Sequence, residues 1–360
     1  MPVALISRTR RFLTDAFGTP LAALWTLMAL AIGVPMAWMA LNWLLIGAVW
    51  PWQPVEICGR KTGICWPFIV EKLQFILFGT YPHDQIWRPA TASAMLCALT
   101  VQTGLQMTGR GLRLSVRQAV LIWVVALIVT FVLMAGGVGG LPPVDSVRWN
   151  GLPVLLILSV VAIALAFPLG VLLALAREQT GYRVLSRFAT SYIEIARGVP
   201  MLTFLFVGVF VLPMMLPPGT RISPVGATLV ALILFHAAYF AEDVRGGLRA
   251  LPTGQAEAAR ALGLAYPALM IRVLLPQAIR SALPSIVNST IGAYKDTSLV
   301  VVLGIHDLTA TARMASSDPG WREYTLEAYF IVGLWFFVSC AFLSATGRAL
   351  PRHRSGRVAA

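Results

Sequence analysis

Eight stretches of apolar residues follow one another along the chain, and they constrain the fold more than any other feature. Several reach the roughly 20 residues that an α-helix needs to cross a bilayer. Only 12% of the 360 residues are charged, whereas a soluble domain has about 25%. We therefore expect an all-α polytopic membrane protein with eight transmembrane helices, at about 21–49, 90–108, 118–135, 152–176, 200–216, 224–243, 284–304 and 326–346.

Three of these expected spans need a separate argument. The first is about twice as long as the 7–15-residue apolar region of a secretory signal, so we expect it to be retained. Polar residues such as Thr100 and Gln102 dilute the second, and the seventh contains Lys295 and Asp296. We keep the second span because omitting it would place the basic N-terminal segment outside the cell.

Basic residues indicate which side of the membrane each loop occupies. With a cytoplasmic N-terminus, most Lys and Arg residues fall in cytoplasmic loops, as the positive-inside rule requires. The net charge of +13 is therefore interpreted as an orientation signal and not as a nucleic-acid-binding patch. This topology predicts a multi-pass membrane protein with both termini in the cytoplasm, and it places the loop 50–88 outside.

The chain has four cysteines, which fall into two groups. Cys58 and Cys65 lie in the loop expected outside, where an oxidising compartment makes a disulfide between them plausible. Their spacing does not fit a C-x-x-C redox or zinc motif. Cys97 and Cys340 lie in apolar runs and are interpreted as packing residues. The four histidines are too scattered for a metal site, so we expect none.

The longest polar connection, residues 244–283, contains a short helix-forming segment. Gln255 to Leu262 is rich in residues with high helix propensity, and Pro252, Gly254 and Gly263 bound it as helix breakers. Ala256, Ala259 and Gly263 share one face of such a helix. This face is open to two interpretations, a docking surface for a partner or an amphipathic linker lying on the bilayer.

The same segment resembles a known motif. Glu257, Ala258 and Ala259, followed by Gly263 and by Val273-Leu274-Leu275-Pro276, match the EAA motif of ABC-importer permeases, with Val273 in place of Ile. Further motifs resemble the polar amino-acid permeases of the histidine, glutamate and arginine type: Glu194-Ile-Ala-Arg197-Gly198-Val-Pro200, Ala238-Tyr239-Phe-Ala-Glu242, Arg245-Gly246-Gly247, Leu275-Pro276-Gln277-Ala278, Leu283-Pro284, Asn288 and Lys295-Asp296-Thr297-Ser298. The resemblance covers about 150–346, and the extended N-terminal region is similar to the larger permease subunit of general L-amino-acid ABC transporters.

The resemblance implies a fold and a division of the chain. We expect a type I ABC-importer permease core at 151–350, an N-terminal extension with about three transmembrane helices at 1–150, and a basic cytoplasmic tail at 351–360. The coupling helix is expected at about 254–264 within the EAA loop. The residues that couple to an ATPase are then Glu257, Ala258, Ala259, Gly263, Leu275 and Pro276.

The resemblance also implies a location in a bacterial inner membrane and a set of partners. The sequence lacks a G-x-x-x-x-G-K-[ST] loop, so it has no phosphate cradle of that kind. ATP and Mg²⁺ are expected on an ABC ATPase dimer, and no cofactor is expected in this chain. The other expected partners are membrane lipid, a second permease subunit, favoured as a paralogue in a heterodimer, and a periplasmic amino-acid-binding protein.

Polar residues in or near the expected spans are candidates for the substrate pathway. Ionisable groups at membrane depth are costly and commonly functional. Lys295 and Asp296, between Gly292 and Thr297-Ser298, suggest a broken helix that lines the pathway or, equally, a structural ion pair. Glu242 is interpreted either as a substrate contact or as a boundary charge paired with Arg245. Glu194 and Arg197 are expected to pair at i,i+3.

His236 and Tyr239 complete the candidate pathway residues. The family more often has Asn at the position of His236, which leaves the ligand preference open. The histidine either contacts the substrate or forms a hydrogen bond inside the bundle, and the second interpretation is slightly favoured. Phe204 replaces a polar residue that is common in related permeases.

The function expected from these features is that of the permease subunit of an ATP-driven, binding-protein-dependent L-amino-acid importer. The alternative is an ion-coupled secondary transporter or channel that works without an ATPase. A membrane-embedded enzyme is disfavoured because no catalytic constellation is present in the sequence. A structural scaffold is disfavoured because it needs neither the bracketed cytoplasmic helix nor the charges at membrane depth.

Overall fold

The computed structural model describes residues 15–60, 63–178, 181–217 and 222–355. These residues form helices joined by short connections, and their β pairing is limited to two isolated bridges. The chain divides into two compact units, residues 1–72 and 73–360. Arg8, Arg10 and Arg11, and residues 356–360 of the expected basic tail, lie outside the described residues.

The first unit contains one long apolar helix and a covalently closed loop. Helix α2 (Pro20–Leu41) starts at Thr19, whose hydroxyl accepts a hydrogen bond from Ala22 N, and it continues as a π-helical turn to Ile46. The loop that follows contains a disulfide between Cys58 and Cys65, with Cα atoms 5.6 Å apart. The ring of Trp50 stacks on Trp52 and also on Trp66, at centroid distances of 5.4 and 6.2 Å.

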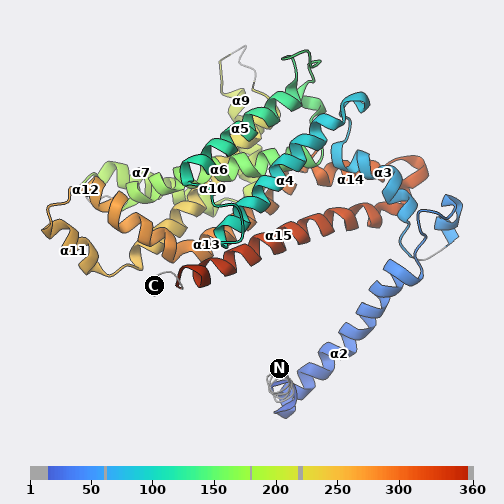
Figure 1. The fold of residues 1–360 in the computed structure, drawn as a ribbon, viewed down its shortest axis with the longest axis horizontal. Helices are drawn as coiled ribbons and strands as arrows, with labels where there is room; N and C mark the ends of the chain where they lie inside the picture. Colours follow the sequence, from blue (N-terminus) through green and yellow to red (C-terminus); the bar gives the residue numbers. More distant parts are fainter. Residues whose placement is uncertain (1–14, 61–62, 179–180, 218–221, 356–360) are drawn as a thin grey trace. The chain divides into compact units, whose positions relative to one another are not determined.

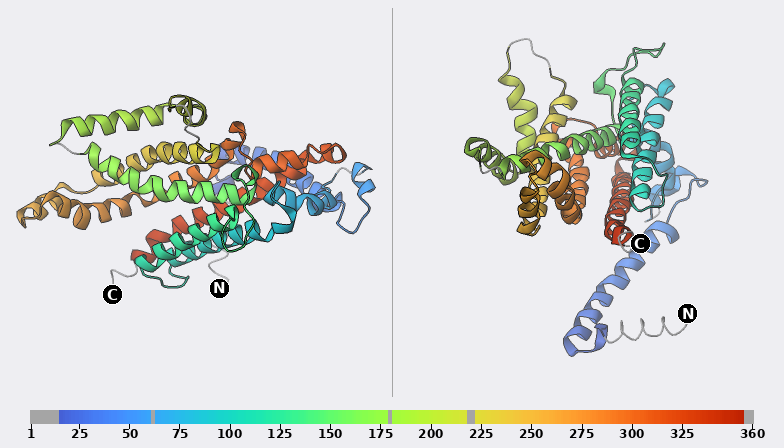
Figure 2. Two further views of the ribbon diagram at one scale, coloured as in Figure 1. Left: turned by 90° about the horizontal axis from the view of Figure 1, so that it is seen from above. Right: turned by 60° about the vertical axis from the view of Figure 1, so that its left-hand side comes forward.

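The second unit is a bundle of long helices that run in roughly the same direction (Figures 1 and 2). Helix α10 is central, since it packs against α6, α7 and α13, while α15 packs against α13 and α4. The long helices are α4 (Trp87–Met107), α5 (Val116–Ala135), α6 (Leu152–Arg177), α7 (Arg183–Gly198), α10 (Pro224–Arg249), α13 (Leu275–Asp296) and α15 (Thr325–Ser355).

Shorter elements connect or extend these helices. They are α3 (Trp66–Phe78), α8 (Met201–Phe206), the π-helical turn Val207–Val211, α9 (Leu212–Met214), α11 (Thr253–Ala261), α12 (Tyr266–Ala268), the π-helical turn Leu269–Leu274, the 3₁₀ helix Thr297–Leu303, α14 (Leu308–Ala315) and the 3₁₀ helix Pro319–Tyr324. Helices α11 and α12 lie at one end of the bundle and α14 lies toward the other (Figure 1).

Small residues set the close packing of α10 against its neighbours. Gly170 of α6 lies against Phe240, where an added Cβ would come within 2.7 Å of the phenylalanine Cβ. Gly247 of α10 lies directly against the carbonyl oxygen of Ala278 in α13. Such small residues let helix backbones approach closely, which is how helices associate within a membrane.

The all-α polytopic architecture is confirmed, but the expected count of eight spans is not. Among the described residues, five helices are long and apolar enough to cross a membrane: Pro20–Ile46, Val116–Ala135, Leu152–Arg177, Pro224–Arg249 and Pro319–Leu350. The expected span 90–108 corresponds to α4, and 284–304 covers the second half of α13 and the 3₁₀ helix that follows it. Both α4 and α13 are more polar than a plain membrane helix.

The expected span 200–216 forms part of a bent pair. Helix α7 and the segment Met201–Met214 meet at an angle of 111°, and counting them as one span gives a sixth. The bend occurs at Val199 and Pro200, whose backbone is extended. Proline cannot continue the helical hydrogen bonding of α7, so α7 ends before it.

The expected break near Lys295 lies slightly later in the chain. Helix α13 remains regular through Gly292, Lys295 and Asp296, and then tightens into the 3₁₀ helix that starts at Thr297. That helix ends at Gly304, which has a φ of 77° and therefore suits a residue without a Cβ. The backbone change thus directly follows Asp296.

Candidate functional site

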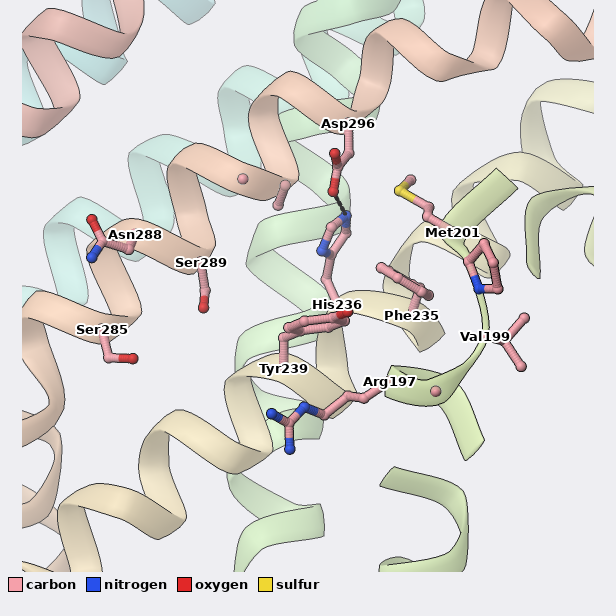
Figure 3. A pocket seen from close by; sticks show the side chains of 14 residues that line it. Arg197, Val199, Met201, Phe235, His236, Tyr239, Ser285, Asn288, Ser289 and Asp296 are labelled. Carbon is pink, nitrogen blue, oxygen red and sulfur yellow. Dashed lines mark ion pairs between the residues drawn. The ribbon is translucent and has the colours of Figure 1, made fainter. Parts of the chain in front are cut away.

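A polar pocket lies where the α7–α8 connection faces α10 and α13 (Figure 3). Its volume is about 670 Å³, which is within the range of small-molecule sites. We call it the central pocket. One wall is the bend itself, from Arg197 to Met201; the other two walls are faces of α10 and α13.

Helix α13 contributes a polar stripe. Ser285, Ser289, Gly292 and Asp296 all line the central pocket, and their spacing of four, three and four residues places them on one helical face. Asn288 lines it as well. The stripe extends over 11 residues, or about 16 Å at 1.5 Å per residue. The pocket therefore has hydroxyl, amide and carboxylate groups along one wall.

Helix α10 contributes Phe235, His236 and Tyr239. The His236 Nε2 atom lies 3.8 Å from the Asp296 Oδ2 atom, and Figure 3 shows the two side chains pointing toward each other. The His236 side chain is 5% exposed and that of Asp296 is 36% exposed. At 3.8 Å this contact is longer than a hydrogen bond, and His236 Nε2 has no hydrogen-bond partner among the described residues.

An ionic cluster lies next to the central pocket, around Glu242 of α10. Its carboxylate is 3.2 Å from Arg177 and 3.5 Å from Arg197, and it is also paired with Arg245. The Arg197 guanidinium lies over the Tyr239 ring at 5.6 Å. Because three arginines surround Glu242, its negative charge is already compensated. Of its two interpretations, the structure shows the pairing with Arg245.

The expected i,i+3 pair of Glu194 with Arg197 is replaced by longer-range pairs. Glu194 pairs with Arg177 at 2.9 Å, while Arg197 pairs with Glu242. Both arginines therefore connect α7 to other helices. A spacing rule for a single helix does not anticipate this, because Arg177 belongs to α6.

The four residues of the Lys295–Ser298 motif do not share one environment. Asp296 lines the central pocket, whereas Lys295 is exposed and is not among the lining residues. Thr297 is fully buried, and its hydroxyl donates a hydrogen bond to the Tyr294 carbonyl oxygen at 2.7 Å. Ser298 is half-buried. The structure thus brings together Asp296, His236 and Tyr239 of the predicted pathway residues.

Sequence reasoning missed the serine side of this site. Ser285 and Ser289 both donate hydrogen bonds to the Asp243 carboxylate of α10, the second at 2.6 Å. The repeat Ser285, Ser289, Gly292, Asp296 was the available signal, since it marks a polar face on an otherwise mixed helix. Asp243 has no such pattern around it, and its partners are more than 40 residues away.

Helix α11, which carries the predicted coupling residues Glu257, Ala258 and Ala259, lies at one end of the bundle (Figure 1). Helix α11 runs from Thr253 to Ala261, and Gly263 ends the turn with a φ of 77°. Glu257 and Ala258 are exposed, as is Leu262, whose side chain is 82% exposed. Ala259 is buried, because α11 packs against the turn Leu269–Leu274.

Of the three residues of the small-residue face, Ala259 lies against the protein's own chain, whereas Ala256 is half-buried and Gly263 is exposed. Glu257, Ala258 and Leu262 lie outward. Pro276 is exposed at the start of α13, and Leu275 packs against the core cluster that includes Ala241 and Val244.

A helical bundle with an internal polar pocket and a separate exposed helix at one end defines a membrane transport subunit. The described residues contain no group of three or more His, Cys, Asp or Glu side chains that could hold a metal ion. The chain belongs to the family described as "Binding-protein-dependent transport system inner membrane component", whose sequence profile matches residues 166–355. It is thus a multi-pass inner-membrane protein.

Curated relatives align over most of the chain. It is 37% identical over 320 residues to the inner membrane amino-acid ABC transporter permease protein YhdY of Escherichia coli (strain K12), covering 88% of this chain and 85% of that protein. It is 32% identical over 398 residues to the glutamate/glutamine/aspartate/asparagine transport system permease protein BztC of Rhodobacter capsulatus, covering 94% and 91%.

A solved structure also resembles the chain. A crystal structure of an amino acid ABC transporter with histidines aligns with a TM-score of 0.50 and 31% identity. The alignment covers 56% of this chain and 91% of that one.

Proposed function

We propose that this chain is the permease subunit of an ATP-driven importer, and that the central pocket is where an L-amino acid passes through it. The relatives named above are amino-acid ABC permeases, and their names supply the substrate class. The observation that carries the proposal is Asp296, a carboxylate at the end of a polar stripe in a pocket of about 670 Å³.

The pocket suits one end of an amino acid in particular. An α-ammonium group needs an acceptor of opposite charge, and Asp296 is the carboxylate among the residues that line the pocket. The Ser289 hydroxyl and the Asn288 amide add hydrogen-bonding groups on the same helix. Phe235 and Tyr239 give the opposite wall an apolar surface, with ring centroids 5.1 Å apart. An amino acid in this pocket would place its ammonium toward α13 and its side chain toward α10.

The exposed surface of α11 is proposed as the contact for an ATP-hydrolysing subunit. Glu257, Ala258 and Leu262 project from a short helix that is fixed to the bundle by Ala259. Such a rigid protrusion can enter a groove on a partner and follow its movement. ATP and Mg²⁺ would be bound by that partner, and α11 would be cytoplasmic, as would both termini.

The remaining partners follow from the family. A substrate-binding protein would deliver the amino acid from outside, and a second permease, proposed to be a paralogue, would complete the pathway. The alternating opening of such a pathway toward each side needs two halves that move against each other. The bend between α7 and α8 supports this arrangement, since it forms one wall of the pocket and leaves the remaining side of the pocket for a second subunit.

Co-purification tests the proposal directly. The chain would be expressed with the products of its neighbouring genes, and the wild type compared with Glu257→Arg/Gly263→Asp. We expect an ATPase to co-purify with the wild type and to be lost from the variant. Amino-acid uptake by vesicles that contain this chain without any ATPase would contradict the proposal and favour an ion-coupled transporter.

A further inference from the structure

A second pocket lies at the ends of α6 and α10 and has a strongly basic lining. Its volume is about 410 Å³, and four arginines and one glutamate line it: Arg177, Arg183, Arg187, Arg249 and Glu178. Ser186 and Thr190 complete the lining. We call it the basic pocket. It is distinct from the central pocket, which shares none of these residues.

Two of the four arginines carry uncompensated charge. Arg249 pairs with Glu178 at 3.1 Å, and Arg177 pairs with Glu194 and Glu242. Arg183 and Arg187 make no ion pair with any described residue. They lie one turn apart on α7, so their side chains project from the same face. The basic pocket therefore presents two free guanidinium groups that an anion could bridge.

The start of α7 adds donors to the same place. No described side chain caps the first turn of this 16-residue helix, whose N-cap residue is Tyr182. The first N–H groups of an uncapped helix are unsatisfied and carry a partial positive charge. These N–H groups therefore favour a negatively charged ligand at the start of α7, as Arg183 does.

An apolar groove adjoins the basic pocket. It is lined by Gly181, Tyr182, Arg183, Val184, Leu185 and Phe188 and has a volume of about 720 Å³. Arg183 belongs to both linings. Val184 and Phe188 are 84% and 70% exposed. A ligand that reaches from one pocket into the other must therefore be anionic at one end and apolar at the other.

The basic pocket and the apolar groove lie on different faces of helix α7. Its buried side consists of Ala189, Ile193 and Ala196, which pack into the bundle. At 100° per residue, the side with Arg183, Arg187 and Thr190 and the side with Val184, Phe188 and Ile195 are neighbouring strips on the remainder of the helix surface. An amphipathic helix with basic residues beside an apolar strip is typical of a membrane interface.

We propose that the basic pocket and the adjoining groove bind one anionic phospholipid, with its phosphate at Arg183 and Arg187 and its acyl chains along Val184 and Phe188. This inference rests on the proposed topology, which places the ends of α6 and α10 at the cytoplasmic surface. Basic pockets between membrane helices on that side suit anionic headgroups. The lipid would hold α7 in place and so support the wall of the central pocket that begins at Arg197.

Lipid retention by the purified transporter tests this site. The whole complex is reconstituted in vesicles of phosphatidylcholine with phosphatidylglycerol in equal parts, extracted, and weighed by native mass spectrometry. At about 1 kcal/mol per Arg, Arg183→Gln/Arg187→Gln should weaken phosphatidylglycerol binding about 30-fold. The control Arg113→Gln/Arg117→Gln removes two exposed arginines, one just before α5 and one in its first turn, on the side expected in the cytoplasm, and should leave retention unchanged.

Two further measurements distinguish a bound lipid from other occupants of the site. Val184→Ser should also lower phosphatidylglycerol retention, and millimolar glycerol phosphate should not displace the lipid. Equal retention in both double-arginine variants would overturn the proposal, as would displacement by glycerol phosphate. Loss of a second permease from Val184→Ser at unchanged lipid retention would identify the groove as a protein interface instead.

The same preparations keep this inference separate from the proposed function. ATP-driven amino-acid uptake is measured in vesicles of phosphatidylcholine alone. Uptake in these vesicles, together with equal lipid retention in all variants, would support the importer function and contradict the lipid site. Absence of uptake from every vesicle composition would contradict the importer, whatever the lipid result.

Discussion

The Nε2 atom of His236 lies 3.8 Å from the Oδ2 atom of Asp296, so one residue of α10 and one of α13 face each other across the central pocket. The imidazole is buried and the carboxylate is partly accessible. The accessible side of Asp296 is therefore the part that can meet a substrate, while His236 borders it from within the bundle.

The first prediction concerns this carboxylate. Asp296→Asn should lower amino-acid uptake by about 10- to 100-fold, because a charge-assisted hydrogen bond contributes about 1.5–3 kcal/mol. ATPase co-purification should be unchanged, since α11 is not involved. Lys295→Gln is the control, because Lys295 is adjacent in sequence but exposed and outside the pocket lining. Equal loss in both variants, measured in vesicles, would argue against a specific role for Asp296.

The second prediction compares two neighbouring glycines of α10. Gly247→Ala should destabilise the protein by about 1–3 kcal/mol, because an added Cβ would collide with the Ala278 carbonyl oxygen. Gly246→Ala should be neutral or stabilising by up to about 1 kcal/mol, since nothing lies within 4 Å of its Cβ position. Thermal unfolding of the purified complex measures both, and a similar shift in the two variants would contradict the packing described.

The third prediction concerns the hydrogen bonds between α10 and α13. Ser289→Ala removes a 2.6 Å hydrogen bond to Asp243, and this should cost about 1.5–3 kcal/mol because the acceptor is charged. Ser298→Ala is the comparison, a half-buried serine without a described partner. Unfolding temperatures should fall only for the first. If they do not, water replaces the serine hydroxyl without loss.

The fourth prediction is a pH dependence at Asp307, which caps α14 outside the spans. Burial raises its pKa to about 6, and its Oδ2 has no hydrogen-bond partner among the described residues. The folded state then binds the proton more tightly than the unfolded state does. The contribution of Asp307 to stability is therefore fully present below about pH 4 and is lost as the pH rises through about 6.

Asp307→Asn should remove this dependence and raise stability at neutral pH. The asparagine can still accept the hydrogen bond that Oδ1 now receives from Ala310 N at 3.0 Å, and asparagine is an equally good N-cap. A rise of the Asp307 pKa from 3.8 to about 6 corresponds to about 3 kcal/mol of stability at neutral pH. Unfolding temperatures at pH 4, 6 and 8 provide the measurement; parallel profiles for the two proteins would show that Asp307 is not the titrating group.

The sequence was sufficient for the features that depend on local pattern. The long apolar runs predicted α5, α6 and α10, and the breakers around Gln255 predicted α11 nearly to its ends. The expected spans at α4 and α13 were not confirmed, because polar residues such as Gln102 and Ser289 make these two helices less apolar than the five that qualify. Long-range pairs were also beyond reach: Arg177 meets Glu242 across 65 residues, and no spacing rule connects them.

The direction of the bend between α7 and α8 could not be predicted from the sequence either. Pro200 indicated where one helix ends and another begins, but not the angle of 111°. The ionic cluster around Glu242 and the small buried face of α7 both connect α7 to other helices, and neither contact can be predicted from Pro200. The side walls of the central pocket were therefore predictable in part, and its closure by the bend was not.

The contact of Gly247 with Ala278 has a mechanical consequence. Together with the hydrogen bonds from Ser285 and Ser289 to Asp243, it joins α10 and α13 at the end from which the connection bearing α11 leaves and returns. The two helices cannot slide past each other there without breaking backbone contact. If α11 couples to an ATPase as proposed, a force applied there would reach α10 and α13 together, and a tilt of the pair would displace His236 and Asp296 at once.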